Sequence, residues 1–308
     1  MTLRLRSIID KSFNTERTLA ITTKIGCINN CAYCPQSVFV KAYKQRSDIT
    51  LMTLNDYKTC LSKVPEKIII SFAGFSEPWL NPNCTSMVLH THEKGYLIRV
   101  NTTGIGMLPS DIEKISHIPF RKFVIHLPDD KGITKLKVDA NYLDVIEKIA
   151  ISDIKSILWK FHNTSPGVKV HPEVLEILDK YKLQITNFGL SNRATNISSD
   201  ANGNITRKTE ALSKCKDFHH NILFPNGDVG LCHMDWSLRH IIGNLISGNF
   251  ESLYKGAEFE RVLNGLKDNS LDITCRLCEK SVSKKRKVMR FISFGTNNRR
   301  TSLNMYDD

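Results

Sequence analysis

Short apolar runs alternate with amphipathic segments along the first 190 residues of this 308-residue chain. The runs have the length and β-branched content of buried strands, and the segments between them have helical periodicity. The predicted strands are residues 18–25, 67–72, 96–100, 122–127, 156–161 and 183–190. The predicted helices are residues 53–63, 82–94, 109–116, 141–150 and 172–181. Strand and helix therefore alternate about six times, which indicates an α/β fold with parallel strands.

Polar clusters follow these predicted strands at their carboxyl ends. A cysteine-rich loop follows the first strand, residues 74–78 follow the second, and residues 101–104 follow the third. His126 and His162 lie at the ends of later strands. Ligands of parallel α/β proteins bind at the carboxyl ends of the strands. We therefore expect these clusters to converge at one mouth of the sheet.

The pattern changes after residue 190. Residues 191–210 are rich in Asn, Ser and Thr and have the character of a linker. Residues 211–283 form a predicted second, smaller domain, in which Asn226-Gly227 marks a β-hairpin and residues 249–267 a helix. Residues 284–308 form a basic tail. The first domain is accordingly assigned to residues 1–190.

Composition narrows the class of protein. Apolar residues make up 41% and charged residues 24% of the chain, a balance typical of globular proteins. No stretch approaches the roughly 20 apolar residues of a membrane helix, and the amino terminus lacks the apolar core of a signal peptide. We therefore expect a cytoplasmic protein with no membrane partner.

The net charge of +12 is unevenly distributed. From Lys280 to the end, eight Lys and Arg residues stand against two Asp. Such a tail is either a solvated segment or a contact for a polyanion such as nucleic acid. The charge pattern leaves both interpretations open.

Nine cysteines in a reducing compartment raise the question of metal binding rather than of disulfides. Cys27, Cys31 and Cys34 lie within one loop and can direct their sulfurs to a single point. Thiolates suit zinc or iron–sulfur clusters, and three of them on a cubane would leave one iron open. A second set, of four, comprises Cys215, Cys232, Cys275 and Cys278. Cys60 and Cys84 stand alone and are predicted to be buried apolar residues.

The spacing Cys27-x3-Cys31-x2-Cys34, with Tyr33 before the last cysteine, resembles the signature of radical S-adenosylmethionine (SAM) enzymes. The resemblance implies that these cysteines bind a [4Fe–4S] cluster whose open iron chelates S-adenosylmethionine. Reduction, by a protein such as flavodoxin or ferredoxin, would then yield a 5′-deoxyadenosyl radical that abstracts a substrate hydrogen. It also implies a partial (β/α)6 TIM-like barrel.

Residues 74–78 resemble the Gly-Gly-Glu element of the same family, with the second glycine absent. Cofactor contacts are therefore implied for Gly74, Ser76 and Glu77, and also for three residues in neighbouring loops, Tyr33, Asn101 and Thr102. An ordinary strand-to-helix turn remains the alternative for residues 74–78. A polar turn is the alternative for residues 101 and 102.

The second cysteine set lies in a sequence context that resembles the SPASM/twitch extension of radical SAM enzymes. Residues 224–232, residues 242–245, a helix and a Cys-x2-Cys pair follow in that order. The resemblance implies an auxiliary [4Fe–4S] cluster on Cys215, Cys232, Cys275 and Cys278. A structural zinc site is the alternative that four cysteines and a hairpin leave open.

Three functions are consistent with these sequence features. The first is radical oxidation of a small polar substrate, a sugar or cyclitol alcohol, because the cysteine layout resembles that of aminocyclitol dehydrogenases. A base would take the hydroxyl proton, with His126, His162, Glu77 and Asp235 as candidates. The second is maturation of a ribosomal peptide by crosslinking or epimerisation. The third is a zinc-stabilised nucleic-acid-binding protein that uses the basic tail.

Overall fold

The computed structural model describes residues 16–162, 165–189, 193, 194, 196, 207–213 and 215–283. The predicted tail 284–308 and most of the predicted linker 191–210 lie outside the described residues. Among the described residues, no helix combines the length and the apolar character needed to cross a membrane.

The predicted alternation of strands and helices is confirmed in the described part of the first 190 residues. The strands are β1 (Thr18–Ile21), β2 (Ile69–Phe72), β3 (Ile98–Thr102), β4 (Lys122–His126), β5 (Ile157–His162) and β6 (Ile185–Phe188). The helices are α2 (Gln36–Lys44), α3 (Leu54–Leu61), the short η1 (Pro78–Leu80), α4 (Cys84–Glu93), α5 (Pro109–Ile115), α6 (Ala140–Ala150) and α7 (Pro172–Lys180). The six strands are parallel and adjacent in chain order.

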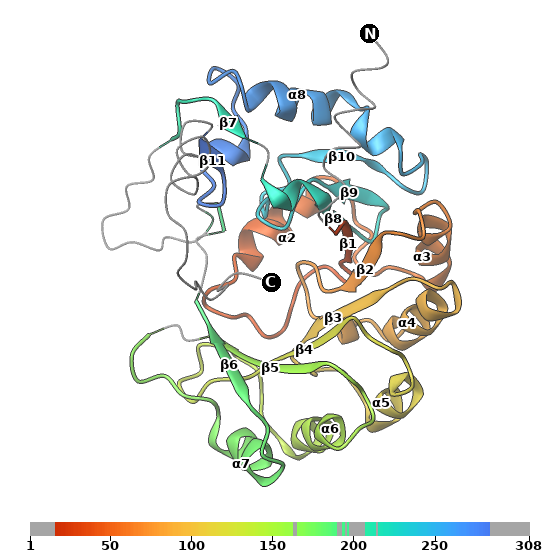
Figure 1. Cartoon of the computed structure of the whole chain (residues 1–308), viewed down its shortest axis with the longest axis vertical. Helices are drawn as coiled ribbons and strands as arrows, with labels where there is room; N and C mark the ends of the chain where they lie inside the picture. The colour runs from red at the N-terminus through yellow and green to blue at the C-terminus, as the bar shows by residue number, and fades with distance from the viewer. Residues whose placement is uncertain are drawn as a thin grey trace, which may run out of the picture.

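The outer layer over β2 to β6 consists of α3 to α7, which follow one another around the outside of the curved sheet (Figure 1). Alternate strand residues such as Ile70 and Phe72 are fully buried and belong to the main hydrophobic core with residues of these helices. This is the partial barrel that the sequence predicts, and it sends the loops after the strands to a common end.

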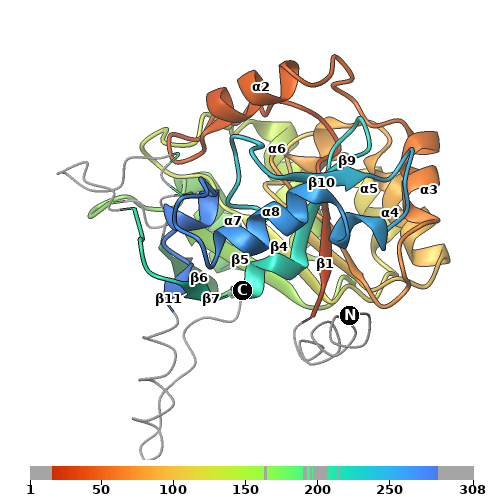
Figure 2. The same cartoon turned by 90° about the horizontal axis from the view of Figure 1, so that it is seen from above.

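Helix α2 is a helix that the hydrophobic pattern did not predict. Its N-cap, Pro35, offers no side-chain cap, and its apolar residues include β-branched valines, so the local sequence carries no clear helix signal. Phe39 and Tyr43 are nonetheless buried in an aromatic cluster, which provides the tertiary support. Figure 2 shows β1 pointing toward α2, so the cysteine loop between them lies at the carboxyl end of the sheet.

The second part of the chain extends the same sheet. Its elements are β7 (Leu212–Ser213), η2 (Lys216–His219), β8 (His220–Leu223), β9 (Asp228–Gly230), β10 (Ile241–Asn244), η3 (Ser252–Tyr254), α8 (Ala257–Gly265), η4 (Thr274–Arg276) and β11 (Val282–Ser283). Strand β8 pairs in parallel with β1, and the sheet order is β10-β9-β8-β1-β2-β3-β4-β5-β6. The free edge of β1 is thus covered, as an exposed edge strand requires.

The predicted hairpin forms between β8 and β9. Gly227 at its tip has φ of +84°, and its N–H donates to the carbonyl of Phe224 at 2.9 Å. The prediction of one helix over residues 249–267 is wrong in detail, because the segment is divided into η3 and α8. The division falls at Gly256, the N-cap of α8, whose backbone is extended with ψ of 156°.

Candidate functional site

The first cysteine set lies in the loop between β1 and α2. Gly26 begins this loop in the left-handed region (φ +84°), which turns the chain sharply away from the strand. The loop is held by the segment that follows β4, since the N–H of Ala32 donates to the carbonyl of Ile133 at 2.9 Å. The N–H of Lys135 donates in turn to the carbonyl of Asn29 at 2.7 Å. Backbone contacts therefore fix the loop before any ligand is considered.

The thiols of Cys27, Cys31 and Cys34 are free and half-buried. Burial, together with the neighbouring thiols, raises the pKa of Cys31 to about 12. Burial also raises the pKa of Cys34 to about 11, against an opposing hydrogen bond from Gln36. Such thiols ionise near neutral pH only when a cation replaces the lost hydration, and soft iron or zinc is the cation that thiolates prefer. The donor set fits a thiolate-bound metal.

Glu77 is the centre of a second group at this end of the sheet. Its carboxylate is 4% exposed and accepts hydrogen bonds from the Thr102 hydroxyl and from both the N–H and the hydroxyl of Thr103, the last two at 2.7 and 2.9 Å. Asn29 of the cysteine loop donates to the Thr103 hydroxyl at 3.0 Å. Burial raises the pKa of Glu77 to about 7, against these hydrogen bonds. Glu77 thus ties together the loops after β1, β2 and β3.

Gly74 makes the turn before Glu77 possible. Its φ is +85°, and a Cβ there would overlap the hydroxyl oxygen of Thr22. That hydroxyl accepts the N–H of Phe75 at 3.2 Å, so the close approach is part of the turn. The Ser76 hydroxyl donates to the carbonyl of Gly26 at 3.3 Å, next to Cys27. The segment 74–78 therefore packs directly on the start of the cysteine loop.

An aromatic wall lies at the ends of β4, β5 and β6. The rings of His126 and His162 stack 5.3 Å apart with an interplanar angle of 10°. His162 also contacts Phe188 at 3.9 Å and Tyr33 of the cysteine loop at 4.7 Å. Burial lowers the pKa of His162 to about 2, helped by the neighbouring positive charges, so its imidazole is neutral. The two predicted histidines and Tyr33 are thus brought together.

Asn101 and Thr102 are placed differently from each other, although they are consecutive. Thr102 is buried and bonded to Glu77, while Asn101 is half-buried in β3 and points to the opposite face of the sheet. Asp235, a candidate base, is 3% exposed and accepts the N–H of His240 at 2.7 Å. Its carboxylate is therefore engaged within the second part of the chain.

All four cysteines of the second set line one pocket. The other lining residues are Asp217, Phe218, Leu231, Met234, His240, Thr274 and Ser281. Cys275 and Cys278 are buried, and burial raises the pKa of Cys215 to about 11. Three separate segments supply these thiols, which fit a closed four-thiolate metal site. Cys60 and Cys84, by contrast, are buried in the main core, as predicted.

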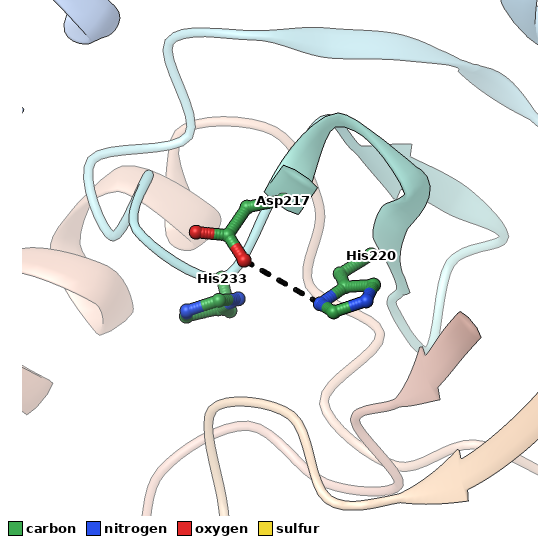
Figure 3. Close-up of side chains that lie close together, drawn as sticks. All are labelled: Asp217, His220 and His233. Carbon is green, nitrogen blue, oxygen red and sulfur yellow. Dashed lines mark ion pairs between the residues drawn. The ribbon is translucent and has the colours of Figure 1, made fainter. Parts of the chain in front are cut away.

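Asp217, His220 and His233 form a polar cluster beside this pocket (Figure 3). One nitrogen or oxygen from each lies within 4.8 Å of the others, which is close enough for a shared cation. The Lys280 ammonium already lies 3.1 Å from Nε2 of His233 and 3.6 Å from Asp217. The cluster therefore already has a positive charge beside two of its three members.

Two contacts connect the two cysteine sites. Trp236, four residues after Cys232, stacks on Phe75 with ring centroids 4.1 Å apart and an interplanar angle of 19°. The guanidinium of Arg193 lies over the Trp236 ring at 6.0 Å and also favours the ionised form of Cys34. Neither Trp236 nor Phe75 stood out in the sequence as more than an apolar residue, because their pairing depends on the hairpin lying beside β1.

Several solved structures share the fold of this chain. BtrN, solved in complex with AdoMet and 2-DOIA, aligns over 87% of this chain and 94% of its own, with a TM-score of 0.57 and 17% identity. SuiB of Streptococcus suis, bound to precursor peptide SuiA, aligns over 84% and 70%, with a TM-score of 0.58 and 11% identity. The chain has the fold of radical SAM enzymes.

A third radical SAM structure, anSMEcpe with bound AdoMet, aligns over 86% of this chain and 88% of its own, with a TM-score of 0.54 and 13% identity. No protein-family model matches the sequence. No curated protein matches it either. The likeness to the radical SAM fold therefore lies in the backbone, where 11–17% identity leaves little sequence signal.

Several site residues were not predicted from the sequence. Asn29, Thr103 and Gln36 all hydrogen-bond within the first site. Gln36 donates to the carbonyl of Phe75 at 2.5 Å and to the thiol of Cys34 at 3.7 Å. Their positions, two residues from a cysteine for Asn29 and Gln36 and next to Thr102 for Thr103, are the only local signal. Single polar residues in loops carry no pattern from which a partner elsewhere in the chain can be inferred.

Proposed function

We propose that this protein is a radical SAM oxidoreductase. Cys27, Cys31 and Cys34 would hold a [4Fe–4S] cluster with one open iron, and Cys215, Cys232, Cys275 and Cys278 would hold an auxiliary [4Fe–4S] cluster. When bound, these groups and S-adenosylmethionine supply hydrogen-atom abstraction from the substrate and acceptance of one electron. The observation that carries the proposal is the pocket lined by four thiols, in a radical SAM fold that also presents the three-thiol loop.

The residues around the first site divide into positioning and contact groups. Glu77 holds the surrounding loops in place, because both of its oxygens are engaged by threonines. The backbone of Gly74 lies against Thr22, and the Ser76 hydroxyl donates to the carbonyl of Gly26, so both residues contact the start of the cysteine loop. The wall of Tyr33, His126 and His162 presents flat rings on which an adenine or a substrate can stack. Asn101 points to the face opposite Thr102 and is available for a polar ligand contact.

We assign a small polar substrate, a sugar or cyclitol alcohol, to this site. Oxidation of an alcohol carbon removes one hydrogen atom, one proton and one electron. The proton requires an acceptor, and His126 is the candidate that we favour over His162 and Glu77. The low pKa of His162 makes it a poor acceptor, and Glu77 is enclosed by its hydrogen bonds.

Anaerobic reconstitution with iron and sulfide tests the proposal. We expect about eight irons per chain and release of 5′-deoxyadenosine after addition of S-adenosylmethionine and dithionite. Zinc at both sites without cleavage of S-adenosylmethionine would contradict the proposal and favour a zinc-stabilised binding protein. Flavodoxin or ferredoxin should replace dithionite as the reductant.

Maturation of a ribosomal peptide is the second candidate, because the structural neighbour SuiB was solved with a precursor peptide bound. Substrates deuterated at carbon separate the two. Deuterium transferred into 5′-deoxyadenosine from a labelled cyclitol supports oxidation of a small alcohol. Transfer from a labelled peptide, and none from the cyclitol, supports the peptide function.

A further inference from the structure

The pocket of the second cysteine set is surrounded by a buried hydrogen-bond network that the reaction itself does not use. His240 is 0% exposed, yet it belongs to neither the predicted ligands nor the predicted bases. Its ring Nε2 lies 2.9 Å from the backbone nitrogen of Thr274, the residue immediately before Cys275. Its Nδ1 lies 2.7 Å from a carboxylate oxygen of Glu258 on α8.

These two contacts define the tautomer of His240. A backbone N–H is only a donor, so Nε2 accepts from Thr274 and carries no proton. The proton of the neutral ring is then on Nδ1, which donates it to Glu258. Arg261 holds Glu258 with two hydrogen bonds of 2.8 Å each. The acceptor nitrogen is thus aimed at Thr274 from a rigid support on α8.

A second bridge joins the loops that carry Cys232 and Cys275. Asp235 accepts the N–H of His240 at 2.7 Å and the hydroxyl of Thr274 at 3.3 Å. Downstream of Cys275, the fully buried Arg276 donates to the carbonyl of Gly265 at 2.7 Å, and it also donates to two carbonyls in 207–210. Both neighbours of Cys275 are therefore anchored by buried polar groups.

We propose that His240 is a positioning residue for the auxiliary metal site. By accepting the N–H of Thr274, it holds the turn that directs the Cys275 thiol into the pocket, with Glu258 fixing the ring. This inference rests on the proposed function, because it takes the four thiols as cluster ligands. Removing a group that orients a metal ligand without itself binding the metal typically lowers metal affinity by about 10- to 100-fold.

The test uses the full chain with Cys27, Cys31 and Cys34 changed to Ala, so that all bound iron reports on the auxiliary site. The protein is reconstituted with ferrous iron and sulfide, and two quantities are measured: the electron paramagnetic resonance spectrum after reduction, and the rate of iron loss to a chelator. We expect His240→Ala to lose iron about 10- to 100-fold faster and to give an altered spectrum. His240→Gln should resemble the parent, because its side-chain oxygen can accept the same N–H.

A backbone pair provides the matched control and does not depend on the folding of His240→Ala. Thr274→Pro removes both the N–H and the hydroxyl at the first position of η4, where proline is compatible with a helical turn, and its ring carbon replaces the hydrogen that faces Nε2 of His240. Thr274→Val removes only the hydroxyl. We expect the proline variant to lose iron at least as fast as His240→Ala, and the valine variant, which loses only the 3.3 Å bond to Asp235, to lose it more slowly than the proline variant.

The outcomes distinguish failure of the proposed function from failure of the positioning role of His240. A parent that binds no iron overturns the proposed function and this inference with it. A parent that binds about four irons, with the same rate of iron loss in His240→Ala, overturns this inference alone. Equal losses in the glutamine and alanine variants, or in the proline and valine variants, also overturn it, because the hydrogen bond would then not be what matters.

Discussion

The two cysteine sites of this protein are built in opposite ways. The first takes three thiols from one short loop, and they are half-buried at the open end of a barrel. The second takes four thiols from segments between Cys215 and Cys278, and the pair on η4 and just after it is buried. As proposed ligands, three thiols from one local loop would leave one iron of a cluster open, which suits exchange of a ligand. A tertiary assembly supplies a complete set, which suits a group that stays bound.

Removing the first site should have the largest effect. With Cys27, Cys31 and Cys34 all changed to Ala, we expect release of 5′-deoxyadenosine to fall to background, because nothing else in the described residues presents three free thiols in one loop. Chromatography of the products measures the loss. About four irons should remain, and loss of all iron would mean that the two sites are not independent.

Removing the second site should abolish oxidation of the substrate but not cleavage of S-adenosylmethionine. In the variant Cys275→Ala/Cys278→Ala we expect about four irons to be lost while S-adenosylmethionine is still cleaved. Oxidised substrate should no longer form. Iron analysis and product assays on the same preparation provide the check. Full substrate oxidation by this variant would contradict a role for the second site in the reaction.

Replacing Gly74 by alanine should destabilise the protein more than the same change at Gly95, a glycine with open space around it. Gly74→Ala and the control Gly95→Ala both place a Cβ at positive φ, which costs about 1–2 kcal/mol. Only at Gly74 does the Cβ meet a neighbour, the Thr22 hydroxyl, and overpacking adds about 1–3 kcal/mol. Denaturant unfolding of the metal-free variants measures both losses. Equal losses would show that the turn relaxes.

Glu77→Gln tests the link between the loops at the first site. The amide offers one acceptor oxygen where the carboxylate offers two, so a buried threonine donor is left without a partner. We expect the free energy of unfolding to fall by about 1–3 kcal/mol and the KM for S-adenosylmethionine to rise. Glu66→Gln, at an exposed position, is the control and should change neither. An unchanged KM in Glu77→Gln would argue against the positioning role.

The contact between the two sites should give the smallest effect. Trp236→Leu removes the stack on Phe75 and should lower the free energy of unfolding by about 0.5–1.5 kcal/mol beyond the loss of apolar area. Trp236→Phe keeps a stacking ring and removes an indole N–H that has no hydrogen-bond partner among the described residues. The phenylalanine variant should therefore be the more stable of the two. The reverse order in thermal unfolding would exclude stacking as the source.

The strands and helices of this chain differ in how well the sequence predicts them. The strands from β1 to β6 were predictable because each is a short apolar run, and their parallel order follows from the helices between them. Helix α2 was missed because its stability comes from burial of Phe39 and Tyr43 rather than from local signals. The helix over residues 249–267 was predicted as continuous because a periodic pattern does not register a turn at Gly256.

The sequence by itself determined the chemistry that is available: three thiols at a spacing that aims them together, four more far downstream, and an α/β scaffold. Local periodicity and spacing are sufficient for these, because each depends on residues close in the chain. The tertiary structure alone decided that β8 lies against β1, that four distant cysteines line one pocket, and that His240 reaches the turn before Cys275. Those outcomes depend on contacts between distant segments, whose partners are selected by the packing of the whole sheet rather than by any local pattern.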